Sequence, residues 1–249
     1  RLMVKAGVPV PAQLSLDPGV EDVSEAEAFL AEHGAVVVKP ARGEQGRGVT
    51  VGVDTPEDLR AAFEAARGEG GVVLLETYVQ GDDLRVLVIN DEVVAAALRK
   101  PPEVTGDGRR SVRQLVESLS RRRAAATGGE SRVPLDAETE RCIRAEGHDW
   151  DSVPARGERL RVRRTANLHT GGALHDVTDK LHPDIARSAI QAVRAIEIPV
   201  AGIDFIVTRP DRPDHVFIEA NERPGLANHE PQPTAERFID LLFPLSIPK

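Results

Sequence analysis

Apolar residues recur at helical spacing in several segments of the chain, and each such segment predicts a helix. The first helix is expected to begin with a capping box formed by Ser24 and Glu27 and to end at Gly34. Further helices are expected after Thr55 and after Ser111, because both residues are good N-caps before an apolar periodic run. The remaining predicted helices cover residues 183–196 and 235–242.

Short β-branched runs lie between these helices and predict strands. The predicted strands cover residues 35–39, 49–53, 72–76, 84–89, 93–98, 202–207 and 216–220. The two strands that flank residues 90–92 are expected to form a hairpin. The segment Arg121–Glu130 contains arginines, alanines and two adjacent glycines, and it is predicted to be a mobile or disordered loop.

The order of these elements predicts an α+β fold with two lobes. A small lobe is expected over residues 21–75 and a large lobe over residues 76–249. The chain opens at Arg1, inside an amphipathic-looking stretch, and not at a methionine. Residues 1–20 are therefore expected to join the lobes to a missing upstream domain of a longer parent chain, although a trimmed chain would explain the same observation.

Composition and charge narrow the class of protein. The chain has 249 residues, of which 41% are hydrophobic and 29% are charged, as in ordinary soluble globular proteins. A formal net charge of −8 disfavours generic nucleic-acid binding. No apolar run approaches the length of a membrane span, and the single cysteine, Cys142, suits a reducing compartment. A cytoplasmic location without membrane or nucleic-acid partners is expected, and self-association into a homo-oligomer is left open.

Candidate chemistry first appears where the predicted strand 35–39 ends in Lys39. Burying a lysine costs free energy unless an anion pairs with it; the alternative is a lysine that reaches solvent. The glycine-rich segment that follows can close backbone amides around phosphate oxygens, although a glycine-rich hairpin tip is the alternative. It matches neither the Walker nor the dinucleotide-binding pattern. Together these features predict a phosphate-binding flap formed by Lys39, Gly43, Gln45, Gly46, Arg47 and Gly48.

A loop with acidic residues follows the predicted strand 72–76. Glu76, Tyr78 and Val79 could offer donors and acceptors to the edge of a purine, and Asp83 could reach a ribose. An acidic surface loop is the alternative interpretation.

A stronger pattern lies near the C-terminus of the chain. Asp204 lies within an apolar strand, and Glu219 and Asn221 occupy alternate positions of another strand, so their side chains project from the same strand face. Two carboxylates and a carboxamide on adjacent antiparallel strands would form an all-oxygen site that suits Mg²⁺. The alternative is that Asp204 is a hydrogen-bonded core residue and Glu219 a surface group.

Arg163 and Arg164 precede a polar loop that ends in two glycines. Arginines in this position suit the neutralisation of charge on a transferring phosphoryl group, and an ordinary surface loop is the alternative. The histidines show no spacing typical of zinc ligands, so no zinc site is predicted.

These segments, in this order, resemble the ATP-grasp superfamily over almost the whole chain. The resemblance is carried by residues 36–40, 43–48, 76–85, 167–172, 202–204 and 218–225. Residues 151–158 and 176–183 are similar to the cyanophycin-synthetase-like branch. The tail over residues 221–234 looks like the N-acetylglutaminylglutamine synthetase family, which combines an acetyltransferase-like N-terminal domain with an ATP-grasp region and makes the precursor of a bacterial osmoprotectant.

The resemblance implies an ADP-forming carboxylate–amine ligase with ATP held between the two lobes. Lys39 and the flap would hold the ATP phosphates, Glu76 and Val79 would contact adenine, and Asp83 the ribose. The metal, Mg²⁺ or alternatively Mn²⁺, would be held by Asp204, Glu219 and Asn221, and the acyl phosphate would face Arg163 or Arg164. Candidate contacts for the small-molecule acid and amine substrates are Arg223, Asn228 and His229. Another peptide ligase of this fold, or a nucleotide-binding regulatory domain without turnover, remains as an alternative.

Overall fold

The computed structural model describes residues 2–20, 22–42, 47–229 and 231–246. Contacts within the chain divide it into two compact units. The first unit comprises Arg1–Pro11, Val79–Lys100 and Leu174–Lys249, and the second comprises Ala12–Tyr78 and Pro101–Ala173. The change of unit after Tyr78 lies close to the predicted lobe boundary at residue 75. Residues 101–173, however, group with residues 12–78 and not with the rest of the predicted large lobe.

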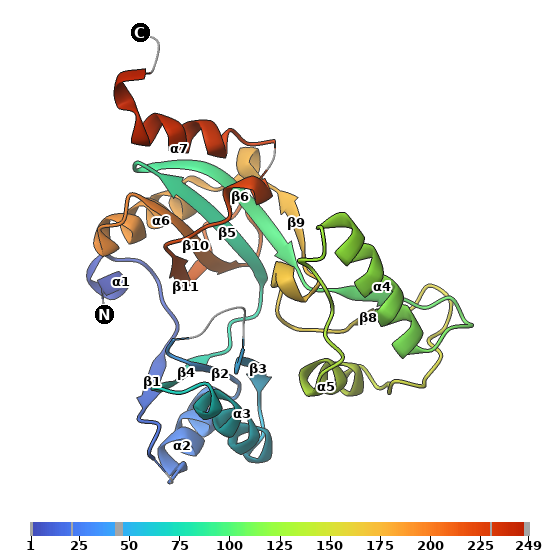
Figure 1. Ribbon diagram of the computed structural model, residues 1–249. Coiled ribbons are helices and arrows are strands. Elements are labelled where there is room, and N and C mark those ends of the chain that lie inside the picture. Colours follow the sequence, from blue (N-terminus) through green and yellow to red (C-terminus); the bar gives the residue numbers. More distant parts are fainter. Residues whose placement is uncertain (1, 21, 43–46, 230, 247–249) are drawn as a thin grey trace. The chain divides into compact units, whose positions relative to one another are not determined.

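The second unit contains a four-stranded antiparallel sheet (Figure 1). In spatial order its strands are β1 (Gln13–Leu16), β4 (Val73–Thr77), β2 (Val36–Pro40) and β3 (Thr50–Val53). Helices α2 (Ser24–His33) and α3 (Pro56–Gly68) pack against this sheet, and Leu59, Phe63 and Val36 are fully buried between the layers. β3 lies at the edge of the sheet, so one side of its backbone has no neighbouring strand in the described part of the chain.

Two predicted N-caps can be compared with the N-termini of the helices in this unit. Thr55 caps α3 as predicted, because its hydroxyl accepts a hydrogen bond from the Asp58 amide at 3.2 Å. The predicted capping box at Ser24 is wrong. The N-cap position is Val23, and the Ser24 amide donates to Asp22 Oδ1 at 2.9 Å, so an acidic side chain two residues upstream satisfies this amide in place of the box.

The remainder of the second unit is built around two further helices. Its elements are β7 (Glu103–Thr105), α4 (Val112–Ala126), α5 (Ala137–Ala145), β8 (Arg159–Arg161) and the 3-10 helix η1 (Leu168–Thr170). Ser111 and Gln114 form a capping box at the start of α4. The prediction of a loop over Arg121–Glu130 is wrong for its first half, because α4 continues to Ala126. Arginine and alanine are strong helix formers, and the change to irregular structure comes only with the positive-φ glycines Gly128 and Gly129.

The first unit contains a five-stranded sheet (Figure 1). In spatial order its strands are β11 (His215–Asn221), β10 (Val200–Val207), β5 (Asp82–Ile89), β6 (Glu92–Lys100) and β9 (Ala173–Asp176). The predicted hairpin is confirmed: Ile89 pairs with Glu92, and Asn90 and Asp91 both have positive φ, as a tight two-residue turn requires.

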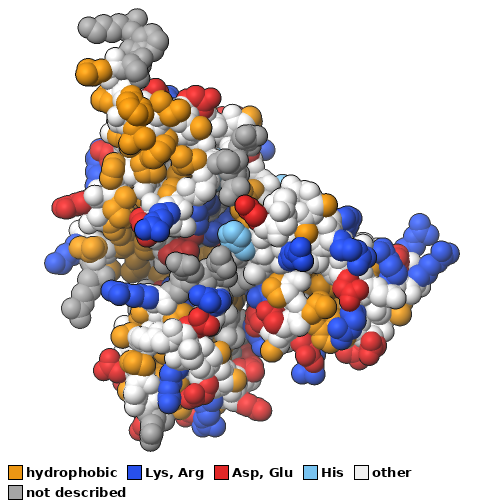
Figure 2. All heavy atoms as spheres, viewed as in Figure 1, with side chains coloured by type: hydrophobic (Ala, Val, Ile, Leu, Met, Phe, Trp, Pro, Cys, Tyr) orange, Lys and Arg blue, Asp and Glu red, His pale blue; other side chains and the backbone are white. Residues whose placement is uncertain are grey.

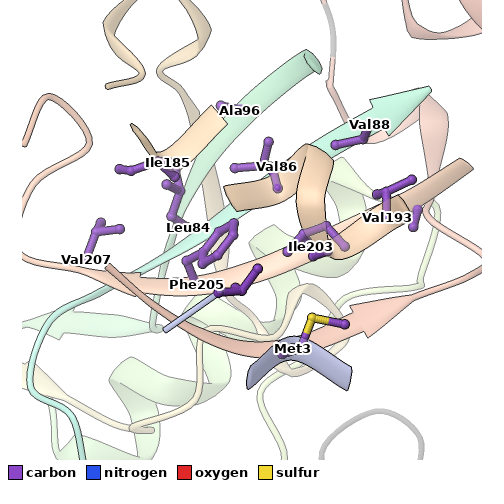
Figure 3. Packing of buried hydrophobic residues seen from close by; sticks show 14 of the residues in the cluster. Met3, Leu84, Val86, Val88, Ala96, Ile185, Val193, Ile203, Phe205 and Val207 are labelled. Carbon is purple, nitrogen blue, oxygen red and sulfur yellow. The ribbon is translucent and has the colours of Figure 1, made fainter. Parts of the chain in front are cut away.

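Both faces of this sheet are covered. Figure 3 shows Leu84, Ile203 and Phe205 of the sheet packed with Ile185 of α6 (Pro183–Ile196) and Met3 of α1 (Leu2–Lys5). Alternate residues of β5 and β6 point to the other face and form a second cluster with α7 (Thr234–Leu242). The remaining short elements are the 3-10 helices η2 (Thr178–Lys180), η3 (Leu226–His229) and η4 (Pro244–Ser246). No helix in the described part of the chain has the length and apolar character needed to cross a membrane.

Candidate functional site

The predicted phosphate-binding lysine has a partner on the neighbouring strand. Lys39 Nζ lies 2.7 Å from Glu76 Oε2, and Gln13 Nε2 donates to Glu76 Oε1 at 2.6 Å. Glu76 is only 3% exposed, so these two donors supply the hydrogen bonds that its buried carboxylate needs. The structure therefore brings together Lys39 and Glu76, which were predicted separately to contact phosphate and adenine. Their contacts with a nucleotide stay predictions.

Only part of the predicted flap falls within the described residues. Gly43, Gln45 and Gly46 lie outside them. Arg47 Nε lies 3.6 Å from Glu69 Oε2, and the guanidinium is two-thirds exposed. Gly48 has φ +66°, and a Cβ at this position would lie 2.9 Å from Glu69 Cγ. The end of the flap therefore needs a glycine for its backbone conformation and for its close approach to α3.

The predicted adenine segment leaves the sheet at the end of β4. The Tyr78 amide donates to the carbonyl of Ala35 at 2.9 Å, which continues the pairing of β4 with β2 by one residue. The Tyr78 ring is exposed and Val79 is half-buried. Their predicted role at a purine stays a prediction.

In the first unit, Asp204 forms the centre of a buried charge cluster. Arg85 binds both of its oxygens: Nε donates to Oδ1, and Nη2 donates to Oδ2 at 2.9 Å. Arg99 Nη2 lies 2.7 Å from Asp204 Oδ2 and 2.9 Å from Asp83 Oδ1. Asp204 is 2% exposed, so the cost of burying its charge is offset by two guanidinium groups. The burial of Asp204 does not by itself require a metal.

The three predicted metal ligands lie on adjacent antiparallel strands, as expected. Asp204 of β10 pairs in register with Glu219 of β11, and Asn221 lies opposite Gly202. Asn221 Oδ1 accepts a hydrogen bond from the Arg223 amide at 2.8 Å. No group of three or more histidine, cysteine, aspartate or glutamate side chains among the described residues could hold a metal ion. The predicted set has only two carboxylates and an amide, so it stays a prediction.

The donor set nevertheless fits a hard divalent cation. Every candidate ligand atom is an oxygen, and Glu219 is an exposed carboxylate next to the buried Asp204. A carboxylate has about four lone-pair sites, so Asp204 could keep its arginine partners and still contribute to a metal site.

Burial and charge shift the pKa values in this cluster. Burial raises the pKa of Asp83 to about 6, against the lowering effect of Arg99. Burial would also raise the pKa of Asp204, but the charges of Arg99 and Arg85 outweigh it and hold that pKa below the ordinary value. Asp83 is thus the group of this cluster that changes charge near neutral pH.

His229 is buried close to these charges. Its Nδ1 atom has no hydrogen-bond partner among the described residues, and its pKa is lowered by burial and by Arg85. The imidazole is therefore neutral at pH 7. Its predicted contact with a substrate stays a prediction, as do those of Arg223 and Asn228.

The two predicted catalytic arginines contact different parts of the second unit. Arg163 is buried, and its Nη1 donates to both oxygens of Asp136 at 2.7 and 3.0 Å and to Thr139 Oγ1 at 2.9 Å. Asp136 is the N-cap of α5, so Arg163 holds the start of this helix. The structure thus gives Arg163 a structural partner, and its role at an acyl phosphate stays a prediction.

Arg164 binds the exposed edge of the small sheet. Its Nη1 donates to the carbonyls of Val51 and Gly52 at 3.2 and 3.1 Å, and Arg141 Nη2 donates to Val51 O at 3.1 Å. Arg141 is itself held by Glu138 at 2.8 and 3.1 Å. Two arginines from the segment 101–173 therefore satisfy the carbonyl groups of β3 that no strand pairs with.

Replacing Gly52 with alanine tests this contact. Gly52 has φ +68°, and a Cβ there would lie 2.1 Å from Arg164 Nη1, so the guanidinium must leave both carbonyls. We expect a loss of about 2–3 kcal/mol in the free energy of unfolding, from left-handed strain and lost hydrogen bonds. Gly34→Ala is the matched control, because φ is +78° and no atom lies within 4 Å of the added Cβ. Urea unfolding that gave equal losses for both variants would contradict a stabilising role of Arg164.

Sequence reasoning missed several residues that shape these sites. Arg85 and Arg99 were not predicted, although Asp83 and Arg85 alternate on β5 toward the face that carries Asp204. That alternation was the sequence signal that could have identified Arg85. No sequence signal identified Gln13 and Arg141, because their partners depend on the order of the strands and on the packing of α5.

Comparison with known proteins supports this picture of the fold. Residues 19–120 match the family described as prokaryotic glutathione synthetase, ATP-grasp domain. The chain is 34% identical over 257 aligned residues to a cyanophycin synthetase from Nostoc sp., which covers 98% of this chain and 28% of that protein. It is 33% identical over 233 residues to the glutathione biosynthesis bifunctional protein GshAB from Listeria innocua, which covers 87% of this chain and 30% of that protein.

A solved structure agrees with the sequence relatives. The bifunctional glutathione synthetase from Pasteurella multocida matches with a TM-score of 0.58 and 29% identity, over 98% of this chain and 35% of that chain. The chain thus spans about a third or less of the length of these relatives. The predicted α+β fold of the ATP-grasp type is confirmed. This chain belongs to the ATP-grasp superfamily, in which the cyanophycin synthetases are among its relatives.

Proposed function

We propose that this chain is the nucleotide-binding and catalytic part of an ADP-forming carboxylate–amine ligase. The observation that carries the proposal is the 34% identity to a cyanophycin synthetase over 98% of the chain. The paired positions of Asp204 and Glu219 on β10 and β11 support it, because they offer the oxygen donors that magnesium–ATP chemistry requires.

The proposed reaction has two steps. The carboxylate oxygen of the acid attacks the γ-phosphorus of ATP, and the bond to the β,γ-bridging oxygen breaks to give an acyl phosphate and ADP. The amine nitrogen of the second substrate then attacks the acyl carbon; the bond to phosphate breaks, and the amine loses a proton. Phosphoryl transfer asks the protein mainly for positioning and charge neutralisation.

The residues of this chain would supply those functions. Lys39, oriented by Glu76, would bind phosphate oxygens, and Asp204, Glu219 and Asn221 would hold a Mg²⁺ ion. The ion, when bound, would neutralise charge on the phosphates. Arg85 and Arg99 fix the Asp204 carboxylate by hydrogen bonds, which suits a ligand that must not move.

The finer proposal is the synthesis of N-acetylglutaminylglutamine, a precursor of an osmoprotectant. It is supported by the sequence of the tail over residues 221–234. A cyanophycin-like product is the second candidate, and the identity to cyanophycin synthetases favours it. A glutathione-like peptide and a regulatory domain without turnover are further alternatives.

The products that the protein forms separate these proposals. The protein is incubated with magnesium–ATP, glutamine and a mixture of other amino acids, with and without acetyl-CoA, and the products are identified by mass spectrometry. We expect ADP together with an N-acetylated glutamine dipeptide. Another peptide would keep the ligase and discard the osmoprotectant precursor. Bound ATP without ADP or peptide would contradict the ligase.

A further inference from the structure

A pocket of about 510 Å³ lies in the second unit, apart from the residues described above. It is formed by the C-terminal half of α4, the segment 131–135 and the loop that carries His169. Its volume falls within the roughly 300–1,000 Å³ that small-molecule sites occupy. Val133, Pro134 and Leu135 form an apolar wall, and Leu135 is an exposed leucine. Pockets that combine an apolar wall with a few convergent polar groups are typical of ligand sites.

Hydrogen bonds fix the walls of this pocket to one another. Ser120 of α4 accepts from the Val133 amide at 3.1 Å and donates to the Val133 carbonyl at 3.5 Å. The Arg132 amide donates to the carbonyl of His169 at 3.0 Å, and Ser131 Oγ donates to the carbonyl of Leu168 at 2.5 Å. All three segments of the wall are therefore cross-linked, so the pocket is held in shape before a ligand arrives.

The charged groups of the pocket have a net positive balance. Arg121 and Arg132 line it together with His169 and one acid, Glu117. Within the described ranges, neither Arg121 nor Arg132 forms an ion pair, whereas arginines elsewhere in this unit, such as Arg110 and Arg159, do. Figure 2 shows Lys and Arg side chains gathered over this part of the molecule, around α4.

The helix itself does not explain this charge. The helix dipole stabilises arginines in the last turn of a helix, and in α4 that residue is Arg123 and not Arg121. Arg132 comes from a different segment, and its backbone is tied to the loop of His169, yet its side chain lines the same pocket. Both guanidinium groups are exposed and form no ion pair within the described ranges, so they are available to a ligand that carries negative charge.

We propose that this pocket binds the carboxylate of an amino acid or short peptide, as the subsite for the acid substrate. The proposal rests on the ligase function above. Arg121 and Arg132 bind the carboxylate through their planar guanidinium groups, and Pro134 and Leu135 contact the apolar part of the ligand.

Binding of two acids to the purified chain tests the proposal by calorimetry at low salt. N-acetylglutamine represents a single amino acid, and tetra-aspartate represents an acidic peptide. We expect one of them to bind the wild type, and Arg121→Gln and Arg132→Gln each to weaken that binding about tenfold. Arg161→Gln, which removes an exposed arginine of β8 outside the pocket, is the control and should leave binding unchanged. Thermal unfolding confirms that the variants fold.

Each outcome decides the proposal. Binding of N-acetylglutamine alone assigns the pocket to an amino acid, and binding of tetra-aspartate alone assigns it to a peptide. No binding of either acid, unchanged binding in both pocket variants, or an equal loss in Arg161→Gln would overturn it. A fluorescent ATP analogue reports nucleotide binding separately and should bind all variants alike. Acid binding that needs Arg132, in a protein that forms no ADP, would keep the pocket and contradict the ligase.

Discussion

Replacing Glu219 with glutamine is expected to reduce ADP formation more than about 100-fold while leaving the fold intact. Glu219 lies opposite Asp204 on the neighbouring strand, and its carboxylate is exposed. Glutamine keeps the shape of the side chain and one oxygen but removes the charge that a divalent cation needs. Substitution of residues that only support metal ligands already costs about 10–100-fold, so loss of a ligand charge should cost more. ADP release at saturating ATP measures the effect.

The control for this variant is Glu222→Gln. Glu222 follows the same strand and is exposed, so this change removes an equal charge three residues away from the predicted site. We expect normal ADP formation in the control and, in both variants, free energies of unfolding within about 1 kcal/mol of the wild type. Raising the Mg²⁺ concentration should partly restore Glu219→Gln. Activity at the wild-type level in Glu219→Gln would remove Glu219 from the metal site.

The Asp204–Glu219 pairing was predictable because it depends only on local rules. Side chains alternate along a strand, and two strands joined by a short turn are antiparallel, so the sequence places both acids on one face. The same holds for α6, whose observed bounds Pro183–Ile196 equal the predicted ones. A proline at the start and a regular apolar stripe define that helix without help from the rest of the chain.

Features that depend on tertiary packing were not predictable in this way. Lys39 meets Glu76 only because β4 lies beside β2 in the sheet, an order that the sequence does not state. Arg163 precedes a polar loop in the sequence, which suggested a phosphoryl group, yet it contacts the start of α5. α5 was missed because only a few of its residues are buried, so its apolar stripe is short.

The charge cluster around Asp204 shows why burial alone is an ambiguous signal. The sequence left open whether Asp204 is a metal ligand or a hydrogen-bonded core residue, and in the structure Asp204 is hydrogen-bonded and buried. The sequence did not distinguish a metal ion from Arg85 and Arg99, because each can compensate a buried carboxylate. The free energy of unfolding without metal therefore tests the ion pairs of Asp204, and ADP formation with Mg²⁺ tests its role as a metal ligand.

Replacing Asp204 with leucine in magnesium-free buffer is expected to lower the free energy of unfolding by about 3–5 kcal/mol. The change leaves Arg85 buried without its carboxylate, whereas Arg99 keeps Asp83. Urea unfolding measures the loss. The pKa of Asp204 is lowered in the folded protein, so its contribution is present above the unfolded pKa and is lost as pH falls through the folded value. The deficit of the variant should therefore shrink in acid.

A second substitution separates the ion pair from simple loss of packing. Arg85→Leu added to Asp204→Leu removes the unpaired guanidinium, and most of the lost stability should return, because buried ion pairs can be replaced by apolar groups at little cost. The exposed pair Arg209–Asp211 is the control: Asp211→Leu should cost less than about 1 kcal/mol. If Asp204→Leu also costs less than 1 kcal/mol, the two arginines do not stabilise the fold through Asp204. Arg85 and Arg99 would then have to be assigned to a ligand.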